Sequence, residues 1–224
     1  MSSKVIVTGS TGMVGKAVLL ECLDHQEISN VLVINRSSLN MNHPKLKEVL
    51  VADFMNLQKI EEQLAGYDAC FHCMGVSAVG LSEETYTRLT FEVSEILANM
   101  MKRQNPNAVF TYVSGVGTDS SEKGRTMWAR VKGRTENMIL NIGFRDAYAF
   151  RPGAILPERG VKSKTGWYNA MYVIMKPFFP LFRKSPNVVG STSIGKAMIQ
   201  LLHEPYPKNV IDPRDIDRLA NQLK

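Results

Sequence analysis

Three glycines in one short turn constrain the fold of this chain more than any other feature of its sequence. They follow a β-branched segment at residues 4–8 (KVIVT) and precede residues 13–23, where apolar positions recur at helical spacing. In this order of strand, turn and helix, a glycine pattern predicts a dinucleotide site. The first glycine allows the tight turn, the second lets backbone N–H groups approach a pyrophosphate, and the third lets the helix close on the strand. We expect the whole loop to hold the diphosphate: Gly9, Ser10, Thr11, Gly12, Met13, Val14 and Gly15.

Strands and helices alternate along most of the remaining chain. Apolar segments typical of buried strands occur at 31–35, 49–52, 67–74, 108–114 and 147–151, and helical patterns occur at 57–64, 83–103 and 128–142. Strands that are apolar throughout imply a parallel sheet covered by helices on both faces. Right-handed crossovers then give a doubly wound α/β fold of the Rossmann type, with the ligand at the carboxyl ends of the strands where their order reverses.

The regular alternation ends at Pro152. Residues 162–184 are rich in aromatic residues, Met and Pro, which predicts irregular helices of a small lobe, and a helix at 193–203 and a short strand at 209–212 follow. Because no repeat or low-complexity linker appears, we expect residues 1–224 to form a single domain, in which residues 152–192 form most of a small C-terminal substrate lobe.

The most apolar stretch of the lobe, residues 168–182 (YNAMYVIMKPFFPLF), resembles a membrane element. It is shorter than the roughly 20 apolar residues that a spanning helix needs, and a lysine and two prolines interrupt it. A substrate lid with its apolar side turned inward is favoured over peripheral membrane contact.

Composition and charge limit the classes of ligand. The chain has 44% hydrophobic and 21% charged residues and a formal net charge of +6, which is typical of a globular protein and suits an anionic ligand. Nucleic-acid binding is disfavoured because the basic residues are scattered rather than arranged in a stripe with aromatic residues. With three cysteines and no signal-like segment before the first strand, the chain is expected in the cytoplasm.

The sequence Cys70-Phe-His-Cys73 matches C-x-x-C but lies in a predicted strand. Residues three apart in a strand point to opposite faces, so these thiols do not converge on a metal. We interpret them, and His72 between them, as packed residues, and we expect no metal site.

The end of the second strand bears on the choice of cofactor. An NAD-specific site usually has an acid there, whereas this chain has Asn35, Arg36 and Ser37. Arg36 can pair with a 2′-phosphate and Ser37 can donate to it, so NADP(H) is preferred, with NAD(H) still possible; an exposed, solvated Arg36 is the alternative. After the third strand, Asp53 is a candidate for binding the adenine amino group, or for capping the helix that follows.

These motifs together resemble the atypical short-chain dehydrogenase/reductase superfamily. The resemblance rests on residues 8–15, Asp53, residues 73–75 (CMG), residues 112–114 (YVS), Lys132 and residues 151–153 (RPG). Residues 127–133 (MWARVKG) and 177–198 are similar to the NAD-dependent epimerase/dehydratase, or Tat-interacting-protein-like oxidoreductase, branch. The resemblance implies that the cofactor also contacts Phe54, Cys73, Met74, Gly75, Lys132, Arg151, Pro152 and Gly153.

The resemblance also implies roles at the reacting end of the cofactor. Ser114 matches the serine that hydrogen-bonds the substrate carbonyl, and Lys132 matches the lysine that holds the nicotinamide ribose and lowers the pKa of a nearby tyrosine. That tyrosine, the general acid, is expected four residues before the lysine, where this chain has Trp128. An indole has no accessible ionisation and cannot replace a phenol as a proton donor. Trp128 is then a stacking wall or a packing residue.

Other tyrosines are candidates for the missing acid, namely Tyr86, Tyr168 and Tyr172. Each is by default a packing residue. The lobe supplies a further apolar set that would line a wide pocket or form a partner surface: Trp167, Tyr168, Met171, Tyr172, Met175, Phe178 and Phe179.

Two functions follow from these expectations. The first is an NADP(H)-dependent oxidoreductase acting on a small, apolar carbonyl or alcohol, as a monomer or homodimer. The second is a nucleotide-binding regulator or scaffold that has lost its general acid and acts through partners.

Overall fold

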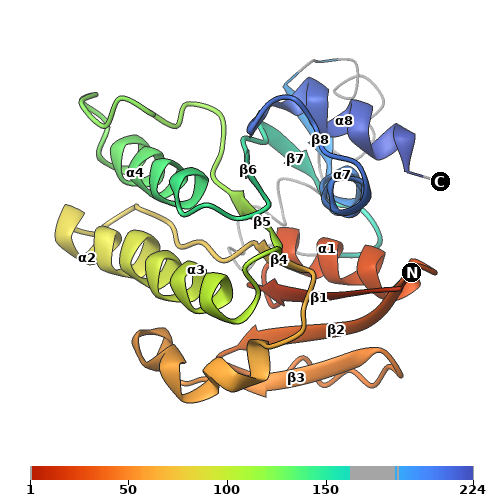
Figure 1. Ribbon diagram of the computed structural model, residues 1–224. Coiled ribbons are helices and arrows are strands. Elements are labelled where there is room, and N and C mark those ends of the chain that lie inside the picture. Colours follow the sequence, from red (N-terminus) through yellow and green to blue (C-terminus); the bar gives the residue numbers. More distant parts are fainter. Residues whose placement is uncertain (1, 162–184, 186, 224) are drawn as a thin grey trace.

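A seven-stranded parallel sheet forms the centre of the molecule (Figure 1). The computed structural model describes residues 2–161, 185 and 187–223. The strand order is β3-β2-β1-β4-β5-β6-β9, and every pairing is parallel. The doubly wound α/β prediction is therefore confirmed. The strands are β1 (Ser3–Thr8), β2 (Ile28–Asn35), β3 (Leu46–Leu50), β4 (Ala69–His72), β5 (Val109–Val113), β6 (Asp146–Phe150) and β9 (Val210–Ile211).

Helices cover both faces of the sheet (Figure 1). Val5 and Val7 of β1 join the core beneath α1 (Met13–Asp24), α7 (Ser191–His203) and α8 (Pro213–Gln222). Ile6, between them, joins the core beneath the other layer, because successive strand residues point to opposite faces. Both sides are dry at residues 5–7, which are therefore apolar in succession. The second layer contains η1 (Phe54–Leu64), α3 (Val93–Gln104) and α4 (Met127–Asn141).

Several predicted elements differ from the structure in kind or extent. The predicted helix at 83–103 is divided into α2 (Glu83–Thr87), a π-helical turn η2 (Arg88–Glu92) and α3. The predicted helix at 57–64 is instead the 3₁₀ element η1, which begins at Phe54 because the Asp53 side chain caps it. Helix α8 was not predicted, although Asp212 at its N-cap and Pro213 in its first turn are ordinary start signals.

A small two-stranded sheet is formed by strands that lie between β6 and β9 in the sequence. β7 (Ala154–Leu156) pairs in parallel with β8 (Val188–Gly190), and Val189 is buried in the core with α7. These strands are the described ends of the predicted lobe. Residues 162–184 lie outside the described residues, and with them the predicted lid and its seven apolar residues.

The packed residues of β4 agree with the sequence interpretation. Cys70 is buried, and the His72 ring lies between the Thr8 hydroxyl, 2.7 Å from Nδ1, and the Ser94 hydroxyl, 2.9 Å from Nε2. Across the described part of the chain, no three His, Cys, Asp or Glu side chains are grouped to hold a metal ion. Within the same ranges, no helix has the length and apolar character that crossing a membrane requires.

Candidate dinucleotide site

The glycine loop lies where the strand order of the sheet reverses. It follows β1, and residues 73–75 follow the adjacent strand β4. Gly9 has a φ of +70°, and a Cβ there would lie 2.7 Å from the carbonyl oxygen of Cys73. A Cβ on Gly15 would lie 2.3 Å from the carbonyl oxygen of Gly9. The loop therefore packs against backbone at both places and has no room for a side chain at Gly9 or Gly15.

Helix α1 presents its N-terminus to this loop. Its N-cap, Gly12, makes no side-chain capping bond, and no acidic residue lies in the first turn. The N–H of Gly12 itself donates to Gly9 at 2.9 Å. The amides of the first turn and the positive end of the helix dipole suit a diphosphate.

Two cavities meet at the glycine loop. A larger one of about 620 Å³ lies toward β5 and β6, and a smaller one of about 220 Å³ lies toward β2. Gly12, Cys73 and Gly75 line both of them. A dinucleotide with its diphosphate at this shared wall would place one nucleoside in each cavity.

The smaller cavity contains most of the residues predicted for the adenosine end. Arg36, Asp53, Phe54 and Met74 line it, whereas Ser37 is exposed and does not. The Asp53 carboxylate accepts from the Met55 N–H at 3.0 Å and from the Asn56 side-chain amide at 2.9 Å. Asp53 therefore acts as the helix cap, the second of its two predicted roles.

A carboxylate that the sequence did not indicate lies behind this cavity. Glu48 of β3 accepts from the side chain of buried Asn35 at 3.3 Å, and from the Ser38 hydroxyl at 2.6 Å and the Leu39 N–H at 3.0 Å. Burial acts to raise the pKa of Glu48, but the three hydrogen bonds and the charge of Lys16 outweigh it and hold the pKa below its ordinary value. The expectation that no acid lies near the end of β2 was wrong, because the acid comes from the neighbouring strand.

Ser114, Trp128 and Lys132 all line the larger cavity, as expected for residues at a reacting centre. The Lys132 ammonium donates to the backbone carbonyl of Ser114. Burial lowers the pKa of Lys132 to about 8, and the charge of Glu136 acts in the opposite direction. At neutral pH the amine is therefore mostly protonated and can readily lose a proton.

The hydroxyl of Ser114 is already engaged. Its oxygen lies within hydrogen-bond distance of a Glu136 carboxylate oxygen and 3.0 Å from the carbonyl of Phe150. A hydroxyl has one hydrogen to donate, and both of these neighbours are acceptors. A substrate carbonyl would have to compete with them for it.

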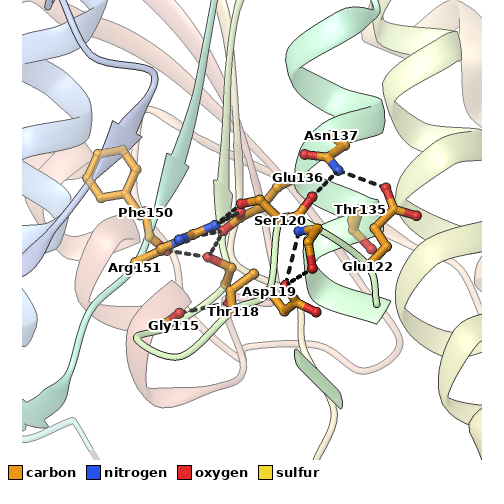
Figure 2. Close-up of polar contacts among 12 residues, drawn as sticks. Gly115, Thr118, Asp119, Ser120, Glu122, Thr135, Glu136, Asn137, Phe150 and Arg151 are labelled. Atoms are coloured by element: carbon orange, nitrogen blue, oxygen red, sulfur yellow. Dashed lines mark hydrogen bonds and ion pairs between the residues drawn. The ribbon is translucent and has the colours of Figure 1, made fainter. Parts of the chain in front are cut away.

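A buried ion pair holds Glu136 (Figure 2). Glu136 is 1% exposed and accepts two hydrogen bonds from Arg151, at 3.0 Å from Nε and 2.5 Å from Nη2. Arg151 also donates to the Ser120 hydroxyl. Arg151 was predicted to contact the cofactor, but its side chain points to Glu136 and does not line either cavity, whereas Pro152 and Gly153 line the larger one.

The remaining candidate acid in the described part of the chain lies in a packed cluster. Tyr86 is 2% exposed and packs with Phe91 and Val131, with Trp128 against them. It does not line the larger cavity. Tyr168 and Tyr172 lie outside the described residues.

Comparisons with known proteins agree with this fold. The chain is 24% identical over 234 residues to protein FMP52-2, mitochondrial, of Scheffersomyces stipitis, covering 100% of both chains. It is 26% identical to protein HTATIP2 of Rattus norvegicus, over 74% of this chain and 68% of the relative. Among solved structures, the Helicobacter pylori ADP-L-glycero-D-manno-heptose-6-epimerase superposes with a TM-score of 0.69 at 16% identity, covering 99% of this chain and 82% of that one.

A second solved structure contains a bound dinucleotide. The Bordetella bronchiseptica enzyme WbmH in complex with NAD⁺ has a TM-score of 0.68 at 15% identity, covering 95% of this chain and 75% of that one.

The relatives overturn one expectation, that of a cytoplasmic protein. FMP52 proteins of Scheffersomyces stipitis, Candida albicans and Meyerozyma guilliermondii are all named mitochondrial. The absence of a signal-like segment before the first strand did not contain this information.

The resemblance to a family, in contrast, is confirmed. The family model described as NAD dependent epimerase/dehydratase matches residues 5–135, more than half of the sequence, and the chain belongs to that family.

Proposed function

We propose that the protein is an NADP(H)-dependent oxidoreductase acting on a small, apolar carbonyl or alcohol. The observation that carries the proposal is the pair of cavities that meet at the glycine loop, where Gly9 and Gly15 leave no room for side chains, with Lys132 in the larger cavity. The NAD⁺ complex of a protein with the same fold supports this placement. When bound, the dinucleotide supplies or accepts a hydride.

The lining of the larger cavity supports the class of substrate. Its described side chains beyond the glycine loop are mostly apolar: Val113, Val116, Trp128, Pro152 and Ile155, beside Ser114 and Lys132. Such walls favour a compact apolar molecule over a polar sugar. A panel of aldehydes, ketones and quinones, each with NADPH, tests this directly. Turnover of none of them would contradict an oxidoreductase of this kind.

Arg36 is proposed to select NADPH over NADH. It is exposed at the wall of the smaller cavity and can pair with a 2′-phosphate, while the oxygens of the nearby Glu48 accept hydrogen bonds from the protein itself. An Arg36→Glu variant should bind NADPH about 10- to 100-fold more weakly, because a charged hydrogen bond is replaced by repulsion. It should then prefer NADH. Titration of both nucleotides by calorimetry measures the change.

The matched control for Arg36→Glu is Arg214→Glu. Arg214 is exposed in the first turn of α8 and lines neither cavity. The Arg214→Glu variant makes the same change of net charge as Arg36→Glu. Because it makes that change away from both cavities, the affinities for NADPH and NADH should be unchanged. Equal effects of the two variants would mean that the response comes from net charge and would remove Arg36 from the site.

Trp128 favours a second candidate function. An indole in place of the general acid is what a nucleotide-binding regulator without catalysis would tolerate, with cofactor occupancy setting the shape of the protein for a partner. NADPH binding without turnover of the panel would support this alternative. Binding of neither nucleotide would contradict both proposals.

A further inference from the structure

The larger cavity contains few groups that can donate a proton. Among its described lining residues, only Lys132 and Cys73 have ionisable side chains. Burial raises the pKa of the Cys73 thiol far above its ordinary value, so this thiol holds its proton. Trp128 has no accessible ionisation, and Ser114 directs its hydroxyl toward Glu136 and Phe150.

Lys132 is held in place and still has donors to spare. An ammonium has three N–H groups, and in the described structure one of them is used on the carbonyl of Ser114. Trp128, one turn earlier on α4, lines the same cavity. The amine therefore lies where a substrate oxygen placed against β5 would meet it.

We propose that Lys132 itself gives the proton to the substrate oxygen, taking the part that a phenol would have at position 128. This inference rests on the proposed oxidoreductase function. In reduction, the carbonyl carbon gains a hydride from the reduced nicotinamide, and the carbonyl oxygen gains a proton from Nζ of Lys132. The N–H bond breaks as the O–H bond forms, the carbonyl becomes an alcohol, and the neutral amine recovers its proton from water.

The charges around Lys132 fit this role. Glu136, one turn later on the same helix, acts to keep the ammonium protonated, and Arg151 from the end of β6 balances the charge of Glu136. The opposing effect, burial, is larger and brings the pKa of Lys132 to about 8. A proton donor of this strength is present in both forms near neutral pH, which is the condition for efficient general acid–base catalysis.

The natural protein gives the first test, with the panel substrate that it turns over. Reduction needs the ammonium, so its kcat/KM should fall as the pH rises through about 8. Oxidation of the matching alcohol needs the neutral amine, so it should rise over the same range. Acetic anhydride acylates only the neutral amine, and mass spectrometry can follow this reaction at Lys132 in the protein without nucleotide. The acylation rate should rise with pH, with its midpoint at the same pH of about 8. A reduction rate that is flat between pH 7 and about 9, or a different acylation midpoint, overturns the inference.

A Lys132→Arg variant separates proton transfer from cofactor binding. The guanidinium keeps the positive charge and the N–H donors, so the Kd for NADPH should stay within about threefold. It does not release its proton in this pH range, so kcat should fall by about 10²- to 10⁴-fold. A kcat within about threefold of the natural value would overturn the inference.

Tyr168 and Tyr172 are the competing candidate donors, and the variants Tyr168→Phe and Tyr172→Phe test them. We expect both to keep the fall in reduction rate above pH 8, and its loss in either variant would move the acid to that tyrosine. Failure of the proposed function is recognised separately. It would appear as no NADPH binding, or no turnover of any panel substrate by the natural protein, before any variant is made.

Discussion

An Arg151→Met variant is expected to lower the free energy of unfolding by about 3–5 kcal/mol. The reason is Glu136, which is 1% exposed and receives two hydrogen bonds from the guanidinium. Without Arg151, a buried carboxylate keeps only the hydroxyl of Ser114 as a close hydrogen-bonding partner among the described residues. An uncompensated charge in that position costs far more than the loss of one surface ion pair.

Urea unfolding followed by circular dichroism measures this effect, and the chain contains its own control. Arg145 pairs with Asp146, with the two side chains 46% and 20% exposed, so Arg145→Met should cost less than about 1 kcal/mol. Adding Glu136→Leu to Arg151→Met should recover much of the loss, because an apolar residue leaves no charge to solvate. If Arg151→Met lowers the free energy of unfolding no more than Arg145→Met does, Glu136 is effectively hydrated and its ion pair with Arg151 does not stabilise the fold.

The sequence predicted the inner strands of the central sheet well because they have two dry faces, whereas the edge strand β3 is partly exposed and begins three residues before the predicted segment at 49–52. Residues 5–7 and 31–34 are apolar in succession, which is typical of strands that are buried on both faces. Element ends were predicted less well, since side-chain caps decide them. Capping by Asp53 lets η1 begin at Phe54, three residues before the predicted helix at 57–64. Asp212 caps α8, whose mostly polar sequence gave little signal.

The candidate site was predicted in part, and the difference is a matter of distance along the chain. The glycine loop acts through residues that are neighbours in sequence, so its pattern indicates its place. Glu48 of β3 reaches Asn35 at the end of the neighbouring strand β2, and Arg151 reaches Glu136 from another element. No local pattern specifies such contacts. The Lys132–Glu136 spacing of one helical turn was the available signal for the buried carboxylate.

A phenol introduced at position 128 provides the second large expected effect. A Trp128→Tyr variant should retain carbonyl reduction at about pH 9 to 10, where the natural protein has lost it. Lys132 is then largely neutral and no longer lowers the pKa of the neighbouring phenol, which keeps its proton up to about pH 10. In the Lys132→Arg background the same change should raise kcat by about 10²- to 10⁴-fold, the usual worth of a positioned acid. Both results are read from NADPH oxidation at 340 nm.

The matched control is Trp128→Phe, which differs from the tyrosine variant by one hydroxyl group. Both replacements remove the indole, which lies against Gly117, where a Cβ would be 3.3 Å from its ring. Any gain caused by the larger cavity therefore appears in both variants, and only proton donation separates them. Equal rates in the two variants would mean that a phenol at this position cannot reach the substrate oxygen. Turnover by the tyrosine variant alone, with none from the natural protein, would instead favour the regulator, because the rest of the catalytic machinery would then be intact and only the acid missing.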